Sequence, residues 1–361
     1  MLLTKLEVPS SLNYIAAFVT MSCNLKCAYC INDPAQADHR SALFPMQNAN
    51  SHIGLTPDEW ITAITRLPVR QDLPVTLCGG EPTIYYGNSG LSTIVNNTEN
   101  YYDLLTNMGN MKFFEQLDSP KQLQRNSPYP SIRVSWHEFE MNRAYKGISD
   151  LVSRCERLSN FGFTVTGSSN ASDVGIYMVG HPSNTEPDKQ EYENRVPFEV
   201  KEFLGTYGGR LYGTYAYEHS TDLVSSGKNH TTLECDCLTY ELLIDPMGFV
   251  WSCHNFLYNA WANGGLKKEF LELKKQNYAF VDNQGIFKYT PSRPIGHILD
   301  SKLELTVLGE MRHCDRYGEC IGCDTKAKKA HFKEGAEYTG QPNYSSVKIE
   351  NIKWPLGFEH D

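Results

Sequence analysis

The chain has 361 residues, enough for one large domain of roughly 200–250 residues and a smaller module, and it carries a net charge of −9. The acidic balance argues against a nucleic-acid partner, no run approaches the ~18 apolar residues of a membrane span, and the amino terminus lacks a signal-peptide stretch. Eleven cysteines without an export signal favour metal binding over disulfides, so we expect a reducing, cytoplasmic compartment.

The first expected strand, residues 14–20, leads into three closely spaced cysteines. Cys23, Cys27 and Cys30 stand in the order C-N-L-K-C-A-Y-C. Thiolates are the protein ligands of iron–sulfur clusters, and three of them can hold three irons of a [4Fe–4S] cube and leave the fourth iron open. The alternative is a structural zinc site, but such sites usually take four ligands in C-x2–4-C pairs. The pattern therefore favours an iron–sulfur cluster.

A second motif follows a helix that begins after Thr56, with Pro57 and Glu59 in its first turn. The short apolar run 74–77 is typical of a buried strand, and it ends at Gly79-Gly80-Glu81. Glycines at this place let the backbone come close to a ligand, and the Glu81 carboxylate can meet an ammonium group. Alone, this tripeptide is an ordinary turn; behind a strand and downstream of the cysteines it indicates a binding segment.

The rest of the first two hundred residues alternates between strands and helices. Further strands are expected at 102–106, 132–136, 174–179 (with 163–166 competing for this fifth place) and 198–203. Such alternation predicts an α/β fold with a parallel sheet and right-handed crossovers. In parallel barrels the active site lies at the carboxyl ends of the strands. Asn107 and His137 stand at such ends, so we expect them near the cysteines and Glu81.

These motifs resemble those of the radical S-adenosylmethionine (SAM) superfamily. The order of elements over roughly residues 12–205 resembles that family's partial (β/α)6 TIM-like barrel. The resemblance implies that SAM occupies the open iron, with its methionine amine at Gly79, Gly80 and Glu81. It also implies cofactor contacts by position for Tyr29, Thr106, Asn107 and Ser135. Core or strand packing is the alternative for Tyr29, Thr106 and Ser135.

A second set of cysteines follows the barrel segment. Cys237 and Cys253 flank an expected β-hairpin with its turn at 246–248, so we expect the two thiols to be neighbours. The spacing C-x10-G-x4-C resembles the opening of SPASM and Twitch modules, which carry auxiliary [4Fe–4S] clusters. This chain has six cysteines after the barrel, fewer than a two-cluster SPASM module needs, so a single-cluster Twitch module fits better. The expected ligands are Cys237, Cys253, Cys320 and Cys323, with Cys235 and Cys314 as alternates.

Two alternatives for this set stay open, namely a structural zinc site on the same thiolates and a cluster whose open iron binds substrate. The predicted organisation is a radical SAM partial barrel over 1–215, a Twitch module of a β-hairpin plus helix over 216–335 and a carboxyl-terminal tail over 336–361.

The resemblance implies an oxidoreductase or isomerase that cleaves SAM reductively, with an external one-electron reductant such as flavodoxin or ferredoxin, and abstracts hydrogen from its substrate. We expect a small polar metabolite, because the segment before Cys23 is too short for the leader-binding domain of many peptide maturases. The alternative is a peptide maturase, of the RiPP or sulfatase-maturating type, that forms a cross-link or an oxidised side chain. An electron carrier is disfavoured, since it needs no Gly-Gly-Glu segment. Candidate catalytic bases are His137, Glu199 and Lys201, for which surface or salt-bridge roles are the alternative.

Overall fold

The computed structural model describes residues 3–27, 30, 54–87, 89–125, 127–202, 205–207, 210–212, 235–262, 266–278, 293–309, 312–314, 326–330 and 337–338. Tyr29, Cys320 and Cys323 lie outside these residues. Within them, no helix is long and apolar enough to cross a membrane.

One mixed α/β sheet of nine strands dominates the fold, in the order β12-β11-β10-β1-β2-β3-β4-β5-β6. The run from β10 through β1 to β6 is parallel, whereas β11 and β12 are antiparallel to their neighbours. The bounds are β1 (Tyr14–Thr20), β2 (Val75–Gly79), β3 (Tyr102–Thr106), β4 (Ile132–Trp136), β5 (Val174–Gly180), β6 (Phe198–Glu202), β10 (Glu241–Ile244), β11 (Phe249–Trp251) and β12 (Gly296–His297). The first six strands therefore confirm the expected alternation, including 174–180 as the fifth.

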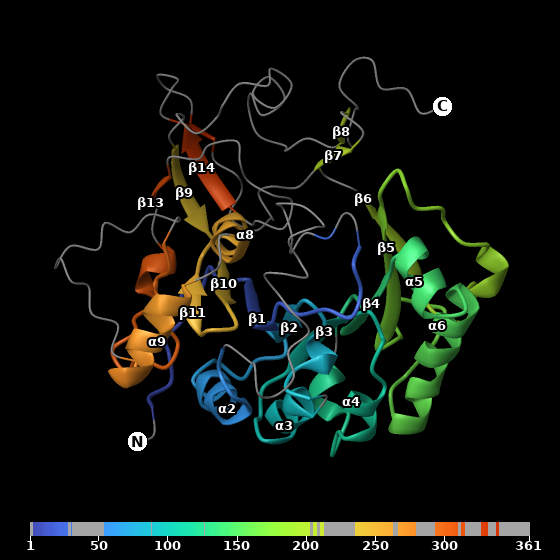
Figure 1. The fold of residues 1–361 in the computed structure, drawn as a ribbon, viewed down its shortest axis with the longest axis horizontal. Helices are drawn as coiled ribbons and strands as arrows, with labels where there is room; N and C mark the ends of the chain where they lie inside the picture. The colour runs from blue at the N-terminus through green and yellow to red at the C-terminus, as the bar shows by residue number, and fades with distance from the viewer. Residues whose placement is uncertain are drawn as a thin grey trace.

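Helices and short 3-10 turns connect these strands. Those of the first part are α2 (Pro57–Thr65), η1 (Pro82–Ile84), α3 (Gly90–Asn96), α4 (Lys112–Glu115), η2 (Lys121–Leu123), α5 (Glu138–Ala144), α6 (Ile148–Glu156), η3 (Arg157–Phe161) and η4 (Lys189–Glu191). Those of the second part are α8 (His254–Ala262), α9 (Lys267–Lys275) and η6 (Thr306–Gly309). Each strand from β2 to β6 is added beyond the previous one, and right-handed crossovers would place the connections between β1 and β6 on one face. Figure 1 shows α2, α3 and α4 together on one side of the strands.

The start of α2 shows how local sequence sets an element. Thr56 accepts a hydrogen bond from the backbone N–H of Glu59 (3.3 Å), and the Glu59 carboxylate accepts one from the backbone N–H of Thr56 (2.8 Å). This reciprocal capping box satisfies donors that a helix start otherwise leaves unpaired. Pro57 fits the first position because it has no N–H to satisfy.

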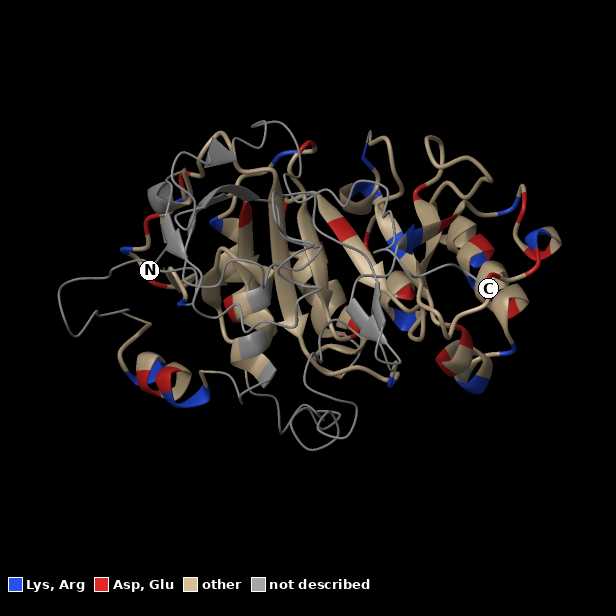
Figure 2. Ribbon diagram, turned by 90° about the horizontal axis from the view of Figure 1, so that it is seen from above, with Lys and Arg blue, Asp and Glu red and all other residues tan. Residues whose placement is uncertain are grey.

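The two faces of the sheet differ in chemistry. One face is apolar and fully buried, through Ile15, Ala17, Val19, Val75, Leu77, Leu104, Ile132, Val134, Val174 and Ile176. Residues one position away in each strand point to the opposite face, which carries Asp103, Arg133, Ser135, Tyr177, Glu199 and Lys201. We call this second face the polar face. In Figure 2 the central strands are mostly tan, and charged residues gather on the outer helices.

A second, four-stranded antiparallel sheet has the order β13-β9-β14-β15. Its strands are β13 (Arg312–Cys314), β9 (Cys235–Thr239), β14 (Lys326–Ala330) and β15 (Glu337–Tyr338), and a separate two-stranded pair joins β7 (Gly205–Tyr207) to β8 (Arg210–Tyr212). Strands β10, β11 and β12 come from the expected second module, yet they extend the same sheet as β1 to β6.

The expected hairpin is shorter than its cysteine spacing suggests. Its arms are β10 and β11, whereas Cys237 lies in β9 and pairs with β13 and β14 in the other sheet. The expectation that Cys237 and Cys253 end the two arms of one hairpin is therefore wrong. Tyr240 is the single residue between β9 in one sheet and β10 in the other. Asp245 closes the turn between β10 and β11, because it accepts hydrogen bonds from the N–H groups of Met247 (2.9 Å) and Phe249 (3.1 Å).

Candidate functional site

Three cysteines lie on one loop at the carboxyl end of β1. Cys27 is buried, and Cys23 and Cys30 are half-buried. The backbone N–H of Cys30 donates to the Cys27 carbonyl (3.2 Å), and the backbone N–H of Leu25 lies 3.4 Å from the Cys23 sulfur. Leu25 is itself buried, so an apolar anchor holds the loop between its first two cysteines.

The Gly-Gly-Glu segment is hydrogen-bonded to the chain that enters this loop. The backbone N–H of Gly80 donates to the Thr20 carbonyl (2.7 Å), and that of Glu81 donates to the Ser22 carbonyl (2.8 Å). A Cβ atom at Gly79 would lie 2.0 Å from the Thr20 oxygen, and one at Gly80 would lie 2.1 Å from the Ser22 oxygen. The glycines are thus required by the approach of this backbone to residues 20–22, where sequence reasoning gave a ligand as the reason.

Glu81 is buried and held by four donors. Its Oε1 accepts hydrogen bonds from Thr83 N (3.1 Å), Thr83 Oγ1 (2.5 Å) and Thr106 Oγ1 (2.7 Å), and its Oε2 accepts one from Asn107 N (2.6 Å). Burial raises the pKa of Glu81, and these donors oppose that shift because they favour the carboxylate. Oε2 has only one of these donors, so it keeps capacity to accept another.

Asn107 joins the two motifs. Its backbone N–H binds Glu81, and its side-chain Nδ2 lies 2.7 Å from Asn24 Oδ1 and 3.7 Å from the Cys23 sulfur. Its Oδ1 accepts from the backbone N–H of Gly109 (2.8 Å), which fixes the amide orientation. One residue at the end of β3 therefore contacts both the first cysteine and the Gly-Gly-Glu carboxylate.

Sequence reasoning missed three contributors to this site, namely Asn24, Tyr145 and Glu140. Asn24 directly follows the first cysteine. Asn24 and Tyr145 both come close to Gly109, where a Cβ atom would lie 2.4 Å from Asn24 Nδ2 and 2.5 Å from Tyr145 Oη. Glu140, buried on α5, accepts a hydrogen bond from the backbone N–H of Lys26 (3.2 Å). The available signals were an amide inside the cysteine spacing and polar residues soon after the fourth strand.

The other expected site residues are placed as follows. Thr106 is buried, donates to Glu81 and accepts from the backbone N–H of Met108 (3.0 Å), which makes it a support for Glu81. Ser135 is half-buried on the polar face and lies opposite Tyr177 in the ladder. His137 precedes α5, and burial lowers its pKa to about 4, so its imidazole is neutral at pH 7.

Glu199 and Lys201 share the polar face of β6, as their alternation predicts. Both are exposed and form an ion pair with each other. Lys201 Nζ also lies 5.4 Å from the centre of the Tyr177 ring. No hydrogen bond joins either side chain to the described part of the cysteine loop.

The later cysteines fall in two places. Cys235 lies directly opposite Cys314 in the β9–β13 ladder, whereas Cys237 lies opposite Arg312 and Lys328. Cys253 is buried at the start of α8, next to His254, whose Nδ1 lies 3.1 Å from the buried Glu241 carboxylate. Strand register thus brings together the two alternates, Cys235 and Cys314.

The donor chemistry of the first loop bears on which metal group it suits. Among the described residues, no three His, Cys, Asp or Glu side chains gather so as to hold a metal ion. A cube binds each cysteine through a different corner, so its ligands stand farther apart than those around one ion. Three thiols on one loop, with amide N–H groups near Cys23, offer donors of the kind that a cluster with an open corner takes.

Comparisons with known proteins give a broad similarity only. No protein-family model and no curated protein sequence matches the chain. Among solved structures, it is similar to Streptococcus suis SuiB, with 13% identity over 71% of this chain and 66% of SuiB and a TM-score of 0.38. For SuiB bound to S-adenosylmethionine, the identity is 12% over 77% of this chain and 70% of SuiB, with a TM-score of 0.39. For SuiB bound to the precursor peptide SuiA, the identity is 12% over 72% of this chain and 67% of SuiB, with a TM-score of 0.37. The match spans about two thirds of SuiB, and at these TM-scores it assigns no function.

Proposed function

We propose that this chain is a radical SAM enzyme whose Cys23, Cys27 and Cys30 hold a [4Fe–4S] cluster with an open iron for SAM. The observation that carries the proposal is the direct connection of the two motifs. The Gly80 and Glu81 amides bind the Thr20 and Ser22 carbonyls at 2.7 and 2.8 Å, immediately before the first cysteine. A ligand on the open iron would therefore lie beside the Gly-Gly-Glu segment.

When bound, a cluster of this kind supplies the electron that splits SAM into methionine and a carbon-centred 5′-deoxyadenosyl radical. The residues of this chain act around it. Glu81 is oriented by Thr83, Thr106 and Asn107, and its Oε2 can accept a hydrogen bond from the ammonium group of SAM. Asn107 and Asn24 hold the amide network beside Cys23, and Glu140 fixes the loop at Lys26.

The proposal extends to the fold. We infer that β1 to β6 form the partial (β/α)6 barrel, which is supported by their parallel sequential order and by crossovers that fall on one face. The polar face would then line the interior, where it could contact substrate and help to exclude water from a radical. The boundaries at 215 and 335 stay part of this proposal.

A second, auxiliary cluster in a Twitch module is a further element of the proposal. Its ligands would be Cys237, Cys253, Cys320 and Cys323, with Cys235 and Cys314 as alternates. The pairing of Cys235 with Cys314 across β9 and β13 supports the alternates. Iron content after single replacement of Cys235 and of Cys237 separates the two sets, because only a true ligand lowers the iron bound per chain.

Two substrate classes are to be tested. One of the similar structures is bound to a precursor peptide, so a peptide is the first class to examine, before the small polar metabolite expected from the sequence. The segment before Cys23 does not separate them. The two classes can be separated with a deuterated cell extract that is divided into a peptide fraction and a small-metabolite fraction. The fraction that holds the substrate transfers deuterium into 5′-deoxyadenosine.

The central experiment is anaerobic reconstitution with iron and sulfide, followed by incubation with SAM and dithionite. We expect 5′-deoxyadenosine from the native chain, and we expect Cys27→Ala to lose about four irons and all product. The matched control is Cys155→Ala, because Cys155 is buried on α6 as a small apolar side chain. Bound zinc in place of iron, or iron without 5′-deoxyadenosine, would contradict the proposal.

A further inference from the structure

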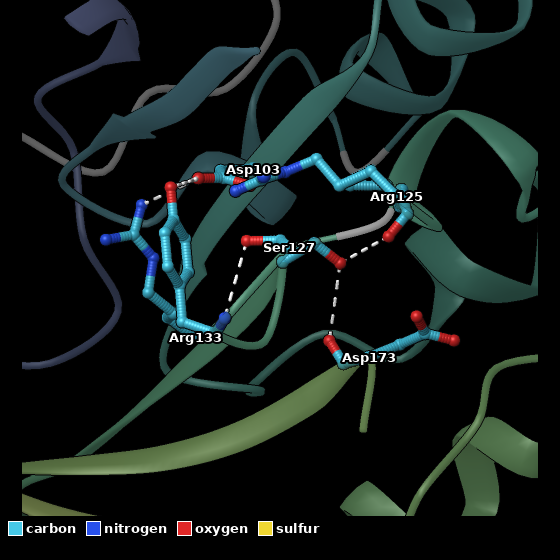
Figure 3. A network of polar contacts seen from close by, with 8 residues as sticks. Asp103, Arg125, Ser127, Arg133 and Asp173 are labelled. Carbon is cyan, nitrogen blue, oxygen red and sulfur yellow. Dashed lines mark hydrogen bonds and ion pairs between the residues drawn. The ribbon is translucent and has the colours of Figure 1, made fainter. Parts of the chain in front are cut away.

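The polar face carries a buried charge cluster on β3 and β4 and in the segment before β4 (Figure 3). Asp103 is buried, and its Oδ1 lies 2.7 Å from both Nε and Nη2 of Arg125. Its Oδ2 accepts a hydrogen bond from Tyr129 Oη (3.2 Å) and lies 3.2 Å from Arg133 Nη2. One carboxylate thus accepts hydrogen bonds from three donors and forms an ion pair with each of the two arginines.

The cluster has one positive charge more than it has negative charges. Two guanidinium groups share Asp103, and among the described residues no other carboxylate forms an ion pair with either of them. Burial alone would lower the pKa of Arg133, but Asp103 and the nearby tyrosines raise it, so Arg133 stays charged. An uncompensated charge away from bulk water is costly unless an anion joins it.

Arg133 is the member that can take a ligand. The Arg125 side chain is 3% exposed, whereas that of Arg133 is 26% exposed. Arg133 uses only Nη2 on Asp103, and its buried Nε has no hydrogen-bond partner, which is unfavourable for a buried donor. Figure 3 shows one edge of its guanidinium toward Asp103 and the rest directed away from it.

The surroundings favour a planar monoanion. In the ladder Arg133 stands directly between Leu105 and Gly175, neither of which is charged, and the carboxylate that it does meet, Asp103, is shared with Arg125. Tyr177, two residues beyond Gly175 on β5, lies on the same face. Guanidinium donors match the two oxygens of a carboxylate, and a single excess charge balances one negative charge better than the two of a phosphate.

We propose that Arg133 binds a carboxylate group of the substrate on the polar face. The naming of the ligand as substrate rests on the proposed function; the binding of a carboxylate does not. From Arg133 to His137 at the carboxyl end of β4 the strand rises about 13 Å. A substrate held here by its carboxylate would extend along the polar face toward the cysteine loop. A peptide with an acidic side chain or a free carboxyl terminus has this chemistry.

The binding test is chemical modification of the reconstituted full chain by phenylglyoxal, with each arginine followed by peptide mass mapping. Acetate well above its Kd should slow modification of Arg133 roughly tenfold relative to equal chloride. The matched control is Arg195, whose guanidinium is already bidentate on Glu156 at 2.8 and 2.6 Å, so acetate should not protect it. Absence of protection at Arg133, equal protection at Arg195 or stronger protection by inorganic phosphate would overturn the proposal.

The functional test uses Arg133→Gln and Arg133→Lys. Loss of a charged hydrogen-bond partner should raise KM for the deuterium-donating fraction roughly tenfold or more in Arg133→Gln, with partial recovery in Arg133→Lys. The turnover number with the saturating fraction should change much less than KM in both variants. A merely structural role would instead lower the melting temperature and the turnover number together. If the native chain makes no 5′-deoxyadenosine but acetate still protects Arg133, only the proposed function fails.

Discussion

Replacement of Gly80 by alanine tests the connection between the two motifs. The added Cβ would lie 2.1 Å from the Ser22 carbonyl oxygen and 2.6 Å from that of Met21, both of them backbone atoms that cannot rotate away. Relief therefore requires the Gly-Gly-Glu segment to move away from residues 20–22. That movement breaks the Gly80–Thr20 and Glu81–Ser22 hydrogen bonds, which measure 2.7 and 2.8 Å.

The expected cost follows from these contacts. Two hydrogen bonds contribute about 0.5–1.5 kcal/mol each, and residual overpacking adds about 1–3 kcal/mol, so the free energy of unfolding should fall by about 2–6 kcal/mol. The matched control is Gly180→Ala at the end of β5, where the new Cβ would lie 3.3 Å from a methyl group of Val200 on β6. We expect this variant to lose less than about 1 kcal/mol.

The assay is anaerobic urea unfolding of both variants, with iron per chain measured after reconstitution. Gly80→Ala should also retain less iron than the native chain, because the cysteine loop starts from the displaced residues. A Gly80→Ala chain that matches Gly180→Ala in unfolding free energy and binds iron normally would refute the reasoning.

Three further predictions concern the site and its support. Asn107→Asp replaces a donor near the Cys23 sulfur with an anion, so the reduction potential of the cluster should fall. An EPR-monitored redox titration measures this potential, and the exposed Asn13→Asp should leave it unchanged. Asp245→Ala removes the acceptor that lies 3.0 Å from the indole N–H of Trp251 and 3.3 Å from that of Trp261, so the free energy of unfolding should fall by about 2–5 kcal/mol. The exposed Asp72→Ala is the control, and an equal loss in both variants would contradict the idea. Burial lowers the pKa of His137 and of His297 to about 4, from the usual 6.5 of a histidine. As the pH falls, the two histidines are protonated in the unfolded chain before they are protonated in the folded chain. The free energy of unfolding should therefore be at its full value above pH 6.5 and decline as the pH falls toward 4, and His297→Gln should flatten that decline. A flat native profile between these pH values would show that neither histidine is coupled to folding.

Much of the fold could be predicted from local pattern. Strands such as 102–106 and 132–136 are runs of apolar and alternating residues between turn signals, and the cap at Thr56 is a local motif. Their sequential parallel order follows from the repeated strand–helix unit. The hairpin at Cys237 could not be predicted in the same way, because its failure depends on which sheet β9 joins, and that is decided by pairing with the distant strands β13 and β14.

The candidate site divides in the same manner. The spacing of Cys23, Cys27 and Cys30 and the Gly-Gly-Glu segment are short-range patterns with chemistry of their own, so they could be identified without coordinates. The contacts of Asn24 and Glu140 with their partners span many residues of chain, since Asn24 meets Asn107 and Glu140 meets the Lys26 amide. No local pattern marks such residues.

The sequence by itself determined the cysteine spacing, the glycine pair and the order of the six strands, because the first two are short-range patterns and the third follows from a repeated strand–helix unit. Only the tertiary structure decided that Thr20 and Ser22 occupy the space a side chain on Gly79 or Gly80 would need, and that two arginines share Asp103. Backbone approach and charge balance are properties of what packing brings together in space, and spacing along the chain does not specify them.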